Sequence, residues 1–150
     1  MNHNEIMDAN VGVLALCMRW IHIVSVVTLI GGFIFARFAV TPALLSMPEA
    51  ERKAADSRIV ASFRPILYVV LGMVVVSGLY NYLSKATLTP RYHMIIGIKL
   101  LFVLHILAVS ILYSLPTANP AKRSRWLTGM ILSGLIAIAL ADYLRFIPTS

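Results

Sequence analysis

Four ionisable side chains lie inside long apolar runs of the sequence: His22, Lys99, His105 and Asp142. A neutral imidazole is the commonest side-chain ligand of metal ions, and it frequently holds haem iron. An ammonium or carboxylate group nearby can balance the charge of such a ligand. Because ionisable groups are costly in an apolar segment, they tend to mark functional sites. The pattern therefore predicts a polar site built around histidine.

The apolar runs are long enough to cross a lipid bilayer, whose hydrocarbon core of about 30 Å requires roughly 17–25 residues of helix. Hydrophobic residues make up 59% of the chain and charged residues only 13%. Soluble domains carry about 25% charged residues. We therefore predict a single integral membrane domain over residues 1–150, with spans at about 13–38, 64–83, 93–115 and 126–147.

Short connections between the spans predict antiparallel neighbours, and hence an all-α four-helix bundle of up-down-up-down topology. Residues 47–62 carry charges of both signs, which predicts an amphipathic helix outside the bilayer. Lys and Arg are more frequent after the first and third spans than on the opposite side. The positive-inside rule then places this helix in the cytoplasm and both termini on the non-cytoplasmic side. The predicted location is the bacterial inner membrane. The net charge of +7 serves topology, so no nucleic-acid partner is expected.

Depth along the spans, counted at about 1.5 Å per residue, brings several polar residues to one level in the outer half of the bilayer. These residues come from all four spans: His22, Tyr80, Asn81, Lys99 and Asp142. Polar groups at one depth usually face the bundle interior and pair with one another. Asp142 can pair with Lys99 or with Arg145. His105 lies near the bilayer centre and points about 120° away from Lys99 around its helix.

Two cofactors suit this polar layer. Haem b would use His22 as an axial ligand and His105 or Lys99 as the second ligand or a pocket partner, with arginines such as Arg37 available to pair with the propionates. Copper is the alternative, because imidazole and thioether suit Cu(I), and Met18 stands one helical turn before His22, with His93 as a further ligand. The simpler interpretations are a hydrogen-bonded packing histidine and a Lys99 stem that extends toward the interface.

Several of these residues resemble a known family. His22, followed by Gly31-Gly32 and Arg37, resembles the first helix of the four-helix membrane protoporphyrinogen IX oxidases, and Lys99-Leu100-Leu101 resembles their lysine-bearing helix. The related copper resistance protein D-like family has the same overall pattern. The resemblance implies a haem b site at His22, with Lys99 nearby, in a small membrane oxidoreductase. Gly97 stands where the oxidases usually carry a histidine, which leaves the reaction open.

Small residues recur every four positions in the last span and line one face of its helix: Gly129, Ser133, Ala137 and Ala141. Such a face permits close helix approach, either within the bundle or across a homodimer or larger membrane complex. We therefore expect an integral-membrane haem b protein of electron transfer or oxidation, whose site comprises His22, His105, Lys99, Arg37, Asp142 and Arg145. The alternatives are a copper-handling protein and a non-catalytic subunit of a respiratory assembly, docked through the small face.

Overall fold

The computed structural model describes residues 3–84, 89–115 and 120–146, and nearly all of these residues are helical. Four long helices dominate the chain: α1 (His3–Phe35), α3 (Glu49–Leu83), α4 (Pro90–Ser114) and α5 (Pro120–Tyr143). A short π-helix, η1 (Ala36–Val40), and the short α2 (Thr41–Leu45) connect α1 to α3. No strand occurs among the described residues.

All four long helices are long and apolar enough to cross a membrane, over Asn10–Leu45, Glu49–Leu83, Pro90–Ser114 and Lys122–Tyr143. Large apolar side chains remain exposed along each of them, for example Val27, Val69, Leu101 and Leu132. Lipid tails can solvate such a surface, whereas water cannot do so without cost. The prediction of an all-helical protein with four helices suited to a membrane is confirmed.

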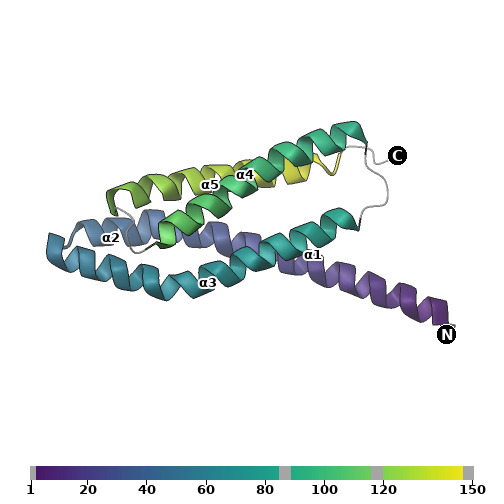
Figure 1. Cartoon of the computed structure of the whole chain (residues 1–150), viewed down its shortest axis with the longest axis horizontal. Helices are drawn as coiled ribbons and strands as arrows, with labels where there is room; N and C mark the ends of the chain where they lie inside the picture. The colour runs from purple at the N-terminus through teal and green to yellow at the C-terminus, as the bar shows by residue number, and fades with distance from the viewer. Residues whose placement is uncertain (1–2, 85–88, 116–119, 147–150) are drawn as a thin grey trace.

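The long helices associate as two hairpins. Consecutive long helices run in opposite directions (Figure 1). The most extensive contacts join α1 to α3, which we call the first hairpin, and α4 to α5, the second hairpin. Contacts of α5 with α1 connect the two, and contacts of α3 with α4 are fewer. Phe33, Leu67, Leu127 and Met130 are fully buried and form the centre of the core.

Gly134 of α5 permits the close approach of the two hairpins. A Cβ atom at this position would lie 2.1 Å from Cδ1 of Ile30 on α1 and 3.9 Å from Cδ1 of Ile106 on α4. Ile30, Ile106 and Gly134 therefore lie at one level along the bundle. This level gives a common reference for the depth of residues on three helices.

The predicted amphipathic helix 47–62 and the predicted span 64–83 are parts of one continuous helix, α3, which contains Pro65. Proline lacks the amide that would bond the carbonyl four residues earlier, and it usually kinks or ends a helix. Here the buried positions keep a helical spacing of seven, four, three and three residues across Pro65: Val60, Leu67, Leu71, Val74 and Ser77. One packing face thus runs through the proline, and tertiary contacts outweigh the local cost.

Candidate functional site

His22 lies half-buried between α1 and α3, and its surroundings fix which ring nitrogen carries the proton. Nδ1 lies 3.0 Å from Oγ of Ser77 and 3.2 Å from the carbonyl oxygen of Val74. The Ser77 hydroxyl donates its own proton to the Met73 carbonyl, so its oxygen accepts from His22. Both partners of Nδ1 are therefore acceptors, and Nδ1 must donate. In the neutral imidazole, Nε2 then keeps the lone pair that a metal ion requires.

Gly78 makes room for this imidazole on α3. A Cβ atom at Gly78 would lie 3.0 Å from Cε1 and 3.4 Å from Nδ1 of His22. The first of these distances is closer than ordinary van der Waals contact, so a larger residue would push against the ring. The glycine next to Ser77 therefore allows His22 to approach α3 closely enough to reach both acceptors.

The charge of one further residue of the predicted layer acts on this histidine. Lys99 of α4 is within electrostatic range of His22. On α3, the side-chain amide of Asn81 donates to the carbonyl oxygen of Met18 at 3.5 Å, one helical turn from His22. Asn81 thus contacts α1 one turn from His22, which agrees with the common depth predicted for these two residues.

Asp142 and Arg37 make contacts with residues other than His22. Asp142 is exposed, and its carboxylate lies 3.9 Å from Nη1 of the equally exposed Arg145. Arg37 follows His22 by fifteen residues, about 22 Å along the helix, and its Nε donates to Oγ1 of Thr128 at 3.1 Å. Arg37 is therefore remote from His22 and does not share a site with it.

His105 lies in the other hairpin. Its Nδ1 is 2.9 Å from Oγ of Ser133, and its Cε1 would be 3.5 Å from a Cβ atom at Gly129. His105 is adjacent to Ile106, at the level of Ile30, whereas His22 precedes Ile30 by eight residues or about 12 Å. The two imidazoles occupy different interfaces at different depths. The structure does not bring them together on one metal ion, and of the two predicted second partners of His22 only Lys99 acts on it electrostatically.

Three residues of the small face of α5 take part in packing within the chain. His105 contacts Gly129 and Ser133, and both Ser133 and Ala137 are buried. These residues are therefore occupied by intramolecular contacts. This agrees with the simpler of the two interpretations of the four-residue repeat.

A buried ion pair joins Asp56 of α3 to Arg123 of α5, and it was not predicted from the sequence. The Nη1 group of Arg123 donates to Oδ2 of Asp56, and both side chains are largely buried. Nη2 of Arg123 donates to the carbonyl oxygen of Leu115 at 3.1 Å, and the guanidinium lies 5.6 Å from the centre of the Tyr113 ring. The basic run that contains Arg123 was interpreted as a topology signal only. The apolar Val60, one helical turn after Asp56, was the sign in the sequence that this carboxylate shares an apolar helix face.

Among residues 3–84, 89–115 and 120–146, no three His, Cys, Asp or Glu side chains come together as a metal-binding group. Comparison of the chain with protein-family models, with curated proteins and with solved structures finds no match in any of the three. The geometry at His22 is therefore the basis on which a function can be proposed.

Proposed function

We propose that this chain is a small integral-membrane haem b protein that works in electron transfer or oxidation, with Nε2 of His22 as an axial ligand. The observation that carries the proposal is the pair of acceptors on Nδ1, Ser77 and Val74. Ligating histidines almost always donate their other ring N–H to such a group, which fixes the tautomer and orients the ring. Haem b, when bound, supplies one-electron redox chemistry.

The residues around His22 suit a haem in distinct ways. Gly78 and Ser77 hold the ring in one orientation against α3. The Lys99 ammonium, whose charge acts on His22, would provide a cation for a propionate. The resemblance of His22, Gly31-Gly32 and Lys99 to the protoporphyrinogen IX oxidase-like and copper resistance protein D-like superfamily supports the same assignment.

The proposed topology is up-down-up-down across the bacterial inner membrane, with both termini on the non-cytoplasmic side. Antiparallel consecutive helices support the alternation (Figure 1). Exposed basic residues at the connection of α2 with α3 and at the start of α5 support a cytoplasmic position for that end: Lys53, Arg58, Lys122 and Arg125. Basic residues are retained on the cytoplasmic side during insertion.

The test is an absorption spectrum of the detergent-purified protein, expressed with adequate haem, before and after reduction with dithionite. We expect a Soret band in the wild type that His22→Gly abolishes. The matched control is His105→Gly. This variant removes the histidine of the other hairpin, whose hydrogen-bond partner is also a serine, and it should keep the Soret band. Added imidazole should restore the band in His22→Gly, because it can occupy the vacated ligand position.

Three results would contradict the haem assignment. A colourless wild-type protein under these conditions is the first, and a Soret band unchanged in His22→Gly is the second. Stoichiometric copper without a Soret band would instead favour the copper-handling alternative. Circular dichroism and gel filtration of each variant separate loss of a ligand from loss of the fold.

A further inference from the structure

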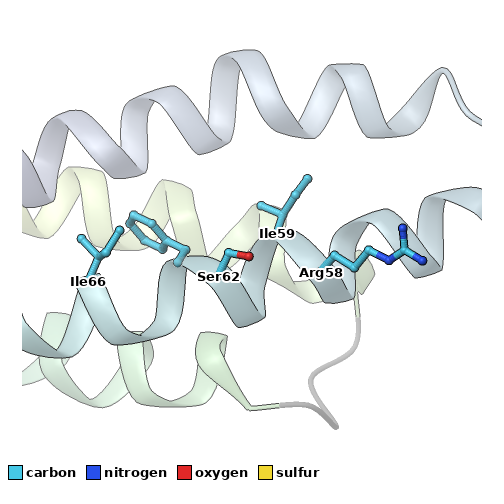
Figure 2. Close-up of a pocket in the computed structure, with 5 residues that line it drawn as sticks. Arg58, Ile59, Ser62 and Ile66 are labelled. Atoms are coloured by element: carbon cyan, nitrogen blue, oxygen red, sulfur yellow. The ribbon is translucent and has the colours of Figure 1, made fainter.

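A surface groove on α3 lies away from the His22 site. It has a volume of about 390 Å³ and is lined by Arg58, Ile59, Ser62, Phe63 and Ile66. Figure 2 shows Arg58, Ile59, Ser62 and Ile66 along one stretch of the helix, with the short Ser62 side chain between longer ones. Ser62 is separated by three or four residues from Ile59, Arg58 and Ile66, so these neighbours surround it on the helix surface. The groove therefore exists because a small polar residue stands within a ring of large ones.

The depth of the groove places it at the edge of the bilayer. The tyrosines at 80 and 82 mark one interface, since tyrosine rings favour the headgroup level. Counting back about twenty residues of helix, or about 30 Å, from Tyr82 reaches Ser62. Arg58 is one further turn out, about 6 Å beyond the hydrocarbon. Ile66 is the same distance inside it.

The residues that line the groove change from polar to apolar in the same direction, from outside to inside the hydrocarbon. Arg58 and Ser62 are exposed polar groups that can bind phosphate oxygens, and Ile59 and Ile66 are exposed apolar side chains. Phe63 is half-buried and contacts Gly32 of α1, with its Cζ 3.4 Å from a Cβ position there. The aromatic ring thus lies between the groove and α1. One end of the groove is cationic at headgroup level, and the other is apolar at acyl-chain level.

We propose that this groove binds an anionic phospholipid, with the phosphate on Arg58 and Ser62 and an acyl chain along Ile59, Phe63 and Ile66. Charge complementarity selects an anionic headgroup over a zwitterionic one, and the apolar half selects a lipid over a soluble anion. Arg58 lies in the exposed basic stretch of α3 that also holds Lys53, and juxtamembrane basic residues attract anionic lipid. The site is independent of the haem proposal, because neither Arg58 nor Ser62 contacts His22.

The experiment is intact-protein mass spectrometry of the detergent-purified chain titrated with phosphatidylglycerol, and with phosphatidylcholine of identical acyl chains. We expect preferential retention of phosphatidylglycerol by the wild type. Arg58→Gln should weaken its binding by about fivefold, to the level of phosphatidylcholine. Ser62→Leu fills the groove and should weaken both lipids.

The matched controls are Arg52→Gln and Ser57→Leu, which make the same changes on α3 at positions that do not line the groove. Both should bind lipid as the wild type does. Equal retention of the two lipids by the wild type would overturn the proposal, and so would equal effects of the groove and control variants. Displacement of phosphatidylglycerol by inorganic phosphate at similar concentration would also overturn it, since it would assign the site to a free anion.

Discussion

The two hairpins each pack a histidine of their earlier helix against a serine and a glycine of their later helix. In the first hairpin, His22 contacts Ser77 and Gly78. In the second, His105 contacts Ser133 and Gly129. The residue types are the same, but the constraints differ. His22 is half-buried and donates to two acceptors, whereas His105 is exposed and has one hydroxyl partner.

This difference determines what each imidazole can do. A hydroxyl can donate or accept, so Ser133 alone leaves both tautomers of His105 open. At His22, the Val74 carbonyl can only accept, and the Ser77 proton is already given to the Met73 carbonyl. Only His22 is thus held with a defined lone pair on Nε2. A histidine in a membrane helix becomes a ligand candidate through its hydrogen-bond partners, not through its presence alone.

The largest expected effect is a loss of stability at the contact between the two hairpins. Asp56→Ala leaves Arg123 buried without its carboxylate partner. Removal of one member of a buried ion pair costs about 3–5 kcal/mol, and we expect that loss in the free energy of unfolding, measured by denaturation in mixed micelles. Because Asp56 belongs to the first hairpin and Arg123 to the second, contacts between the hairpins should weaken most.

The control for this change removes both charges. Asp56→Leu combined with Arg123→Met should recover most of the lost stability, because no uncompensated charge then remains buried. If Asp56→Ala alone were as stable as the wild type, water would have to reach the ion pair. An exposed pair contributes only about 0–1 kcal/mol.

A smaller effect on stability is expected from replacing the glycine beside each histidine. Gly78→Ala places a methyl group 3.0 Å from the His22 ring, which its hydrogen bonds hold in place. We expect a net loss of up to about 2 kcal/mol in the free energy of unfolding, because overpacking costs about 1–3 kcal/mol and alanine returns about 1 kcal/mol of helix propensity. Gly129→Ala places the methyl group at an ordinary 3.5 Å from His105 and should be neutral or stabilising, since alanine favours helix by about 1 kcal/mol. Equal effects of the two changes would mean that the His22 interface is not the tighter one.

The smallest effect is expected from replacing the serine that bonds each histidine. Ser77→Ala leaves the Val74 carbonyl in place, so Nδ1 of His22 should keep its proton, with a loss of about 0.5–1.5 kcal/mol for one hydrogen bond. Ser133→Ala removes the partner of His105 altogether, and the tautomer distribution of that ring should change. Nitrogen NMR of histidine-labelled protein in micelles distinguishes the two nitrogens of each ring. A change of tautomer at His22 in Ser77→Ala would contradict the role assigned to the Val74 carbonyl.

Part of the site could be predicted because depth along a helix follows directly from residue number. The common level of His22 and Asn81 was predictable for that reason, and Asn81 contacts α1 one turn from His22. The rotation of each helix was not predictable in the same way. His105 faces α5, and Arg37 bonds Thr128, because of which neighbour packs against each face.

The sequence by itself determined that this protein is helical and suited to a membrane. Continuous apolarity over about twenty residues is a local property, and in a bilayer the backbone can satisfy its hydrogen bonds only within the helix or a closed barrel. Tertiary structure alone decided the environment of each polar group. The acceptors of His22 come from α3, more than fifty residues away in the chain, and Arg123 meets Asp56 across 67 residues. Such contacts depend on how helices rotate and pack, which hydropathy does not encode.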